Sequence, residues 1–242
     1  MDDPAAGPPI EPPWWTPRRP GRRRQPLSRD VVVEAAIRVL DREGADALTV
    51  RRLADELETG SATLYWHVSG KDELAELVYD HVMGEVELPE PDPSRWQEQL
   101  KDLGRQAYRV LLRHRDLARL SLGRIPTGPN MLRIMEWSIG LLRSAGLTDQ
   151  AAAYAGDMFG RYLDASVLEV TMQSGPSPEA IGDYFRSLPP ERFPNMTAAT
   201  TAMFAGTDDD RFEFGLDLLV RGLATFETRP DDVRDGYRSR NA

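Results

Sequence analysis

Residues 48–68 have the sequence LTVRRLADELETGSATLYWHV, and this stretch decides the fold. Its first half carries apolar residues at the spacing of one helix face: Val50, Leu53, Ala54 and Leu57. Thr49 precedes them and can cap a helix, although Arg52 stands where a complete capping box has Glu or Gln. The pattern predicts a short helix that begins after Thr49.

A second short helix is predicted to begin near Gly60 or Ser61. Most of its side chains would face outward toward a groove, namely Ser61, Ala62, Thr63, Tyr65, Trp66 and His67. Leu64 and Val68 lie four residues apart and would face the core of the same small unit. Two short helices around a tight turn indicate a helix-turn-helix, whose second helix enters the major groove of DNA.

The segment TLYWHV at residues 63–68, with Leu48-Thr49 before it and Lys71 after it, resembles the DNA-binding domain of the tetracycline repressor (TetR) family. The second half of the chain is also similar to the regulatory domain of the tetracycline repressor subgroup. That likeness is carried by Trp96, the LRHRD segment at 112–116, Leu122-Gly123, Pro126 and Thr127. The resemblance covers roughly residues 27–226. It implies a ligand-responsive regulator that binds a double-stranded, palindromic operator as a homodimer.

The resemblance also implies DNA contacts. Residues expected near base edges are Arg51, Ser61, Ala62 and Thr63, and residues expected along the backbone are Tyr65, Trp66, His67 and Lys71. Arg51 can bond O6 and N7 of guanine, while Ala62 and the methyl of Thr63 can touch a thymine methyl. The alternative for Tyr65 and Trp66 is packing inside the small domain.

One residue departs from the family pattern. Glu58 stands where the family usually has glycine after the first of these two helices, and Gly60 follows two residues later. A left-handed turn conformation at a residue other than glycine costs about 1 kcal/mol. We therefore expect a reshaped turn.

Composition and charge agree with a globular DNA-binding protein. The chain has 242 residues, of which 40% are hydrophobic and 29% charged. The absence of cysteine excludes disulfides, thiolate metal sites and a cysteine nucleophile. Net charge is −9, yet residues 18–71 carry 11 Lys and Arg against 8 Asp and Glu, whereas residues 72–242 carry 19 against 28. Positive charge is thus concentrated in the part expected to face DNA.

The chain divides into four parts. Residues 1–26, with eight prolines and five arginines, are predicted to form a disordered arm, which is either a solvated tail or places Arg22, Arg23 and Arg24 along phosphates or in a minor groove. Residues 27–71 form the helix-turn-helix domain and residues 72–228 a ligand-binding and dimerisation domain. Residues 229–242 form a flexible tail.

The predicted fold is all-α, because no alternating β-branched runs suggest a sheet. Besides the two short helices, helices are expected over 29–43, 71–87, about 95–114, a short segment ending at 122, 130–145, 148–173, one short segment between 178 and 188, and 208–227. The proline-rich segment at residues 88–93 separates the four helices before it, which include the two short ones, from the helices after it.

The effector site is expected to differ from that of the tetracycline repressor. By resemblance, the positions that bind the drug and its Mg²⁺ hold Glu87, Leu103, Ala107 and, in place of the metal-ligating histidine, Ser121. With three histidines in the chain, no histidine-rich metal set exists, so we expect no metal and no cofactor. His114, in the LRHRD segment, is interpreted as structural.

An apolar and aromatic pocket is predicted instead. Its further residues are Arg124, Ile125, Ile134, Trp137, Met158 and Tyr162. Trp137 would lie against a flat ring, and Arg124 would meet an acidic or carbonyl group. The alternative is that the stripe of Tyr154, Met158 and Tyr162 belongs to the core.

The last helix is predicted to form a dimer interface together with helix 148–173, as the family does. Its apolar face carries Phe212, Leu216, Leu219, Leu223 and Phe226. The alternative is that this face closes the core of one subunit.

The leading hypothesis is a cytoplasmic repressor, released from its operator by a small hydrophobic or aromatic effector other than Mg²⁺-tetracycline. Activation instead of repression stays open. An architectural DNA-binding protein without a ligand is the main alternative. A helical enzyme is disfavoured because no catalytic motif is found, and a membrane protein because no apolar run could span a bilayer.

Overall fold

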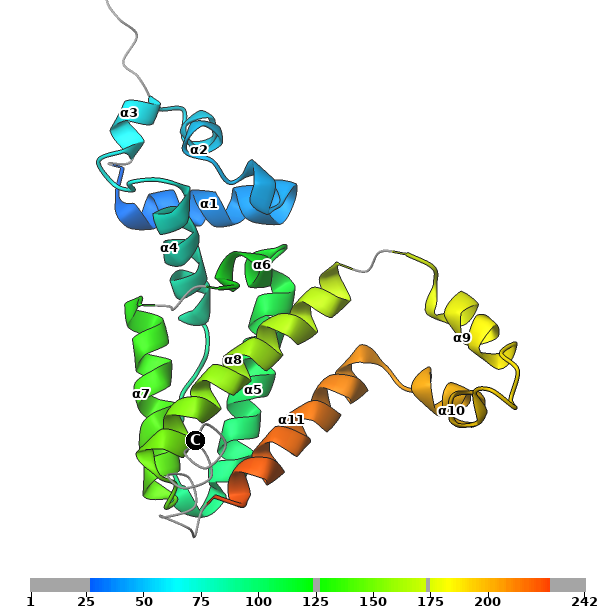
Figure 1. The fold of residues 1–242 in the computed structure, drawn as a ribbon. Helices are drawn as coiled ribbons and strands as arrows, with labels where there is room; N and C mark the ends of the chain where they lie inside the picture. The colour runs from blue at the N-terminus through cyan, green and yellow to red at the C-terminus, as the bar shows by residue number, and fades with distance from the viewer. Residues whose placement is uncertain (1–26, 124–126, 173–174, 227–242) are drawn as a thin grey trace, which may run out of the picture.

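The computed structural model describes residues 27–123, 127–172 and 175–226, which form eleven α-helices, two short 3-10 helices and no strand (Figure 1). The all-α prediction is confirmed. In chain order the elements are α1 Arg29–Glu43, η1 Ala45–Ala47, α2 Val50–Glu56, α3 Ser61–Leu64, α4 Lys71–Met83, η2 Pro93–Arg95, α5 Trp96–Arg113, α6 Leu117–Ser121, α7 Pro129–Ser144, α8 Asp149–Thr171, α9 Pro178–Arg186, α10 Pro194–Met203 and α11 Asp208–Ala224.

Helices α1–α3 form a small N-terminal domain. The caps are those that the sequence predicts: the Ser28 hydroxyl accepts from the Val31 N–H at 3.3 Å, and the Thr49 hydroxyl accepts from the Arg52 N–H at 3.1 Å. The side chains that close the core are fully buried, namely Val32, Val39, Leu40, Leu48, Leu53 and Leu64. The two short helices therefore have the arrangement of a helix-turn-helix.

The turn between α2 and α3 is reshaped as the sequence predicts. Glu58 has a φ of 48°, in the left-handed region. The Thr59 N–H donates to the Ala54 carbonyl at 2.9 Å, which is the closing bond of a Schellman motif. The turn thus ends α2 with a glutamate in the position that glycine usually fills.

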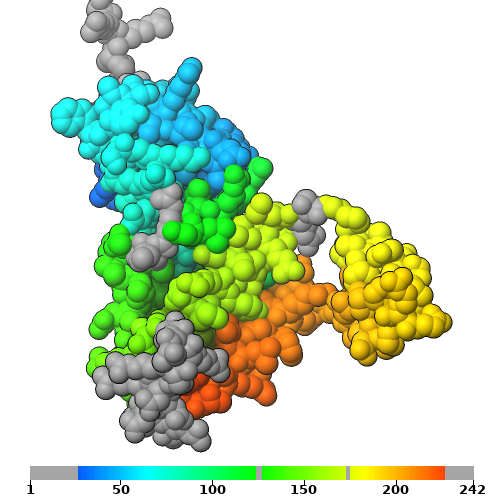
Figure 2. Space-filling view, viewed as in Figure 1, coloured from blue at the N-terminus to red at the C-terminus, as the bar shows by residue number. Residues whose placement is uncertain are grey.

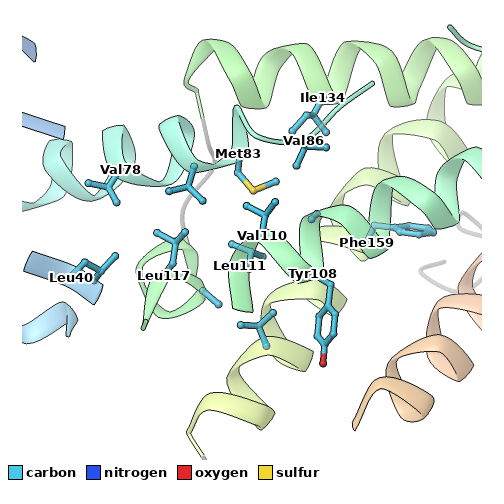
Figure 3. Close-up of a cluster of buried hydrophobic side chains, with 14 of the residues drawn as sticks. Leu40, Val78, Met83, Val86, Tyr108, Val110, Leu111, Leu117, Ile134 and Phe159 are labelled. Atoms are coloured by element: carbon cyan, nitrogen blue, oxygen red, sulfur yellow. The ribbon is translucent and has the colours of Figure 1, made fainter. Parts of the chain in front are cut away.

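Helix α4 joins the N-terminal domain to a larger C-terminal domain built from α5, α6, α7, α8 and α11 (Figure 1). One apolar cluster runs through both domains. Figure 3 shows Leu40 of α1 with Val78 of α4 and Leu117 of α6, followed by Val110 and Leu111 of α5. The core is therefore continuous from the N-terminal domain through α4 and α6 into the C-terminal domain.

Helices α9 and α10 project from the rest of the molecule (Figures 1 and 2). They pack on each other, with the rings of Phe185 and Phe204 at 5.7 Å between centroids. Helix α10 is missing from the sequence prediction, because its sequence PNMTAATTAM has no apolar face and contains three β-branched threonines. Helix α4 also ends earlier than predicted, at Met83 instead of residue 87, because a turn begins at Gly84.

None of the helices in the described ranges combines the length and the apolar character needed to cross a bilayer.

Two leucines of α7 test how much the core contributes to stability. Leu141 is fully buried, whereas Leu132 on the same helix is 52% exposed. Leu141→Ala should lower the free energy of unfolding by about 2–5 kcal/mol, because it leaves a cavity. Leu132→Ala should change it by less than about 0.5 kcal/mol. Urea unfolding measures both values, and equal losses in the two variants would contradict this packing.

Candidate functional site

The exposed surface of the N-terminal domain carries aromatic side chains at the end of α3. Trp66 is 88% exposed and Tyr65 is 58% exposed, although rings of this size are normally buried. Both rings therefore lie outside the small core, and the alternative that they pack within it is wrong. Ala62 and Thr63 are exposed beside them, while Ser61 and His67 are half-buried.

Two adjacent arginines of α2 have different surroundings. Arg52 bonds Glu43 at 2.6 Å and Glu56 at 2.9 Å, and these bonds raise its pKa. Arg51 is exposed and has no carboxylate partner within the described ranges. Arg52 therefore ties α1 to α2, and Arg51 is free to contact DNA.

Lys71 is the first residue of α4, and the residues two positions before and after it, Ser69 and Glu73, are hydrogen-bonded to each other. The Ser69 N–H donates to Glu73 at 2.7 Å, and the Ser69 hydroxyl donates to the same carboxylate at 2.8 Å. The backbone bond from Ser69, followed by the hydroxyl bond, lowers the pKa of Glu73. Lys71 itself is exposed and makes no ion pair in the part of the chain that the structure describes. It lies in reach of a phosphate that approaches the turn.

The two domains are joined by a set of polar contacts that we call the domain junction, made by Asp41 and residues 44–46 on one side and residues 114–119 on the other. Asp41 accepts from the Arg115 N–H at 3.2 Å and contacts Nδ1 of His114 at 3.1 Å. Asp116 accepts from the Ala45 N–H at 2.9 Å. His114 and Asp116 of the LRHRD segment thus have the structural role predicted for His114.

Asp116 takes a strained backbone conformation at this junction. Its φ is 57°, in the left-handed region that residues other than glycine rarely occupy. Gly44 lies against it with a φ of 87°, and a Cβ at Gly44 would lie 2.7 Å from Oδ2 of Asp116. The junction therefore depends on a close approach that only glycine allows.

Helix α4 is also bound to the start of α7. Asp80 is buried and accepts from the Met131 N–H at 2.9 Å and from the Asn130 amide at 3.2 Å. Glu76 accepts from the Thr127 N–H at 3.3 Å. A Cβ at Gly128 would lie 2.2 Å from the Asp80 carboxylate, so glycine permits the contact. Helix α4 is thereby bound to the start of α7, and it also contacts α6 and α1.

The residues predicted to line the effector pocket are only partly brought together. Ala107 is buried, Leu103 is half-buried and Glu87 is exposed. Trp137 is half-buried, and its indole N–H donates to the Pro89 carbonyl at 2.7 Å. Ile134 is buried beside Met83 and Val86 in the core (Figure 3). Arg124 and Ile125 lie outside the described residues, as do Arg22, Arg23 and Arg24 of the arm.

Two of the predicted pocket residues need correction. Tyr162 donates to the Phe212 carbonyl at 2.8 Å and stacks on the Phe212 ring, so it belongs to the packing of α8 against α11. Met158 is 49% exposed in an apolar groove between the same two helices. The alternative that this stripe belongs to helix packing is correct for Tyr162.

The groove between α8 and α11 has an almost wholly apolar lining, which includes Tyr154, Met158, Leu219, Leu223 and Phe226. The dimerisation role of Leu219, Leu223 and Phe226 stays a prediction, and all three residues line this groove. Phe212 and Leu216 need correction, because they are buried inside one subunit. Phe212 stacks on Tyr108 at 3.9 Å between ring centroids, so it closes the core instead.

Two family models match this chain. Residues 32–78 match the model for bacterial regulatory proteins of the tetR family, and residues 88–226 match the tetracyclin repressor-like C-terminal domain. The chain belongs to the TetR family. It is a DNA-binding transcriptional regulator.

This TetR-family protein has similar relatives of known structure and sequence. ActR of Streptomyces coelicolor is 45% identical with a TM-score of 0.80, over 84% of this chain and 97% of ActR. ActR in complex with actinorhodin is 44% identical with a TM-score of 0.79, over 84% and 98%. The transcriptional repressor DrrR1 of Streptomyces coeruleorubidus is 34% identical over 87% of this chain and 82% of DrrR1. A regulator of Saccharopolyspora erythraea is 36% identical over 64% of this chain and 65% of that protein.

Sequence reasoning missed several groups that position the site of this TetR-family regulator. Asp41, Asp80 and Asp116 accept hydrogen bonds from backbone N–H groups that are distant in the sequence. Of these three, only Asp116 lies in a sequence motif, the LRHRD segment. Asp164 and Tyr79, which lie near Ser121, were also missed. Among the described residues, no group of three or more acidic or histidine side chains is placed to hold a metal ion.

Two substitutions separate the expected roles of Arg51 and Lys71. Arg51→Ala should weaken binding to a DNA site selected from a random pool by about 1–3 kcal/mol and relax the preference at one base position. Lys71→Ala should weaken binding to all sequences alike. It should also reduce the slope of log K against log salt concentration by about one, because one phosphate contact is lost. Fluorescence anisotropy over a salt series distinguishes them. Unchanged affinity in both variants would exclude this docking surface.

Proposed function

We propose that this protein is a homodimeric repressor in the cytoplasm, released from a palindromic operator by a small aromatic effector that binds without Mg²⁺. The observation that carries the proposal is the domain junction, which joins an exposed DNA-contacting surface to a separate helical domain. A binding event in the second domain thereby has a physical path to the first. The complex of the relative ActR with actinorhodin supports an effector of this class.

The path from the effector to DNA passes through α6 and α4. Asp116 and His114, just before α6, bind the N-terminal domain, and Arg119 of α6 bonds Asp46 at 3.0 Å. A ligand that displaces α6 therefore pulls on η1 and α1. Asp80 transfers a movement of α7 to α4 in the same way. Either movement changes the distance between the two recognition helices of a dimer, and so the fit to two successive major grooves.

The ligand acts only through differential affinity. It releases DNA if it binds the arrangement that does not fit the operator more tightly, by roughly 1.4 kcal/mol for each tenfold change in operator affinity. The continuous core of Leu40, Val78 and Leu117 makes the two arrangements discrete, because close-packed helices shift as units.

Dimerisation is proposed to occur through α8 and α11. The groove between them has an almost wholly apolar lining, in which Leu218 is 55% exposed, and Phe214 on α11 adds further exposed apolar area, at 68%. An apolar surface of this kind marks an interaction site. A second copy, related by a two-fold axis, would cover it with its own α8 and α11, so that four helices meet at the interface.

Mg²⁺-tetracycline does not suit the site. The metal-ligating histidine is replaced by Ser121, whose hydroxyl donates to the Ala118 carbonyl at 2.8 Å. A neutral serine hydroxyl is a weak ligand for a divalent cation compared with imidazole or carboxylate. An aromatic ring on Trp137 would bind through dispersion and apolar contact instead.

The two alternatives have less support. An architectural DNA-binding protein would not need a separate ligand-binding domain. The contacts of Asp80 and Asp116, which connect the C-terminal domain to the N-terminal domain, favour a regulator instead. We propose a regulator rather than an enzyme, since the relatives are transcriptional regulators.

The dimer interface is tested by charge. Leu219→Glu combined with Leu223→Glu should yield monomers, because two carboxylates would lie unpaired in an apolar seam. Leu132→Glu, on an exposed site of α7, is the control and should leave the dimer intact. Sedimentation equilibrium distinguishes the 27.2 kDa chain from its dimer. A monomeric wild type, or a dimeric double variant, would exclude the interface.

Effector class is tested by titrating the protein–operator complex. Actinorhodin should release the DNA, whereas tetracycline with Mg²⁺ should not, since Ser121 replaces the metal ligand. Trp137→Ala should abolish release and leave operator affinity unchanged, while Met135→Ala on the same helix should behave as wild type. Release by micromolar tetracycline with Mg²⁺, or full induction of Trp137→Ala, would contradict the pocket assignment.

A further inference from the structure

A cluster of polar side chains lies where α4, α6 and α8 meet. Its members are Tyr79 of α4, Ser121 of α6 and Asp164 of α8, and Ser121 lies beside both of the others. Helix α6 contacts both α4 and α8. Two of them, α4 and α6, are the helices that bind the N-terminal domain.

This cluster has too few hydrogen-bond donors for its acceptors, and the unpaired acceptor is Oδ1 of Asp164. Ser121 has a single hydroxyl proton, which it donates to the Ala118 carbonyl at 2.8 Å. That proton cannot also serve Asp164. The Oδ1 atom of Asp164 is buried and has no hydrogen-bond partner among the described residues. Burial raises the pKa of Asp164 to about 6, which agrees with a carboxyl that is poorly compensated.

A buried acceptor without a donor costs free energy, so it is rarely retained without a reason. Tyr79 does not supply the missing hydrogen to Oδ1. Burial raises the pKa of its phenol and keeps it neutral, and the group beside it is Ser121. The donor that completes the cluster must therefore come from outside these three side chains.

The face of α8 that leads to Asp164 has room beside it. Gly156 and Gly160 precede Asp164 by two turns and one turn of the helix. A Cβ at either glycine would meet nothing within 4 Å. The backbone of α8 is therefore open at Gly156 and Gly160, in the two turns before Asp164.

We propose that Asp164 determines effector specificity: its Oδ1 accepts a hydrogen bond from a phenolic or alcoholic hydroxyl of an aromatic effector lying along Gly156 and Gly160. This inference rests on the proposed effector-released function. Hydroxylated aromatic compounds are selected over their O-methylated derivatives, because a methyl ether has no hydrogen to donate and its methyl group would meet Oδ1. The bond also acts on Ser121 and Tyr79, and so on α6 and α4.

The test compares emodin, a polyhydroxylated anthraquinone, with its fully O-methylated derivative. Binding to the full-length protein is measured by calorimetry, and release of the operator by anisotropy. Wild type should bind emodin at least tenfold more tightly than the ether. Asp164→Leu should abolish this preference, whereas Asp164→Asn, which keeps an acceptor oxygen, should retain part of it. Asp157→Leu, an exposed position on the same helix, is the control and should behave as wild type.

Thermal unfolding without ligand separates recognition from a structural role. Asp164→Leu removes an unsatisfied carboxyl, so its Tm should equal or exceed that of wild type. A lower Tm with equal weakening for both probes would show a structural role and overturn the inference. Undiminished preference in Asp164→Leu would also overturn it, while the proposed function would stand. If wild type bound neither probe and no aromatic compound released the operator, the proposed effector class would be wrong and the inference with it.

Discussion

The exchange of carboxylates and backbone N–H groups at the domain junction is the contact on which the rest of this regulator depends. Asp41 of the N-terminal domain accepts from the backbone before α6, and Asp116 in return accepts from the backbone of η1. Charge-assisted bonds of this kind are directional, so they define how the small domain is oriented. Asp116 is held in a left-handed conformation to make its bond, and Gly44 leaves space for it. Loss of this geometry would leave two folded domains without a defined relation between them.

Helix α4 is the second connection between the two domains. Its apolar face packs into a core shared by both domains, and Asp80 on another face binds the start of α7. A helix fixed on several sides cannot bend gradually, because each neighbour is close-packed against it. It therefore moves with α6 and α7 as a unit. The polar cluster around Ser121 lies at the same place, where a small ligand can act on the helices that carry the DNA-binding surface.

The C-terminal domain has more apolar surface than one subunit buries. Within α11, Phe212 and Leu216 point into the subunit, while Leu219, Leu223 and Phe226 line the groove shared with α8. One helix thus contributes to both the core and an exposed apolar face. That division explains why a single apolar stripe in the sequence supports two interpretations at once: Phe212 and Leu216 close the core of one subunit, while the dimer interface remains a proposal for the exposed part.

The sequence alone determined the local features, because caps, turns and apolar spacing involve residues within a few positions of each other. Ser28, Thr49 and the left-handed turn at Glu58 could be predicted for this reason, together with the helix-turn-helix and most helix bounds. The tertiary structure alone decided which partner each side chain meets. Met158 faces α11 rather than Trp137 because helix rotation is set by packing, which periodicity does not specify. The acceptors at Asp80, Asp116 and Asp164 likewise depend on helices far away in the sequence, whose approach only the folded core defines.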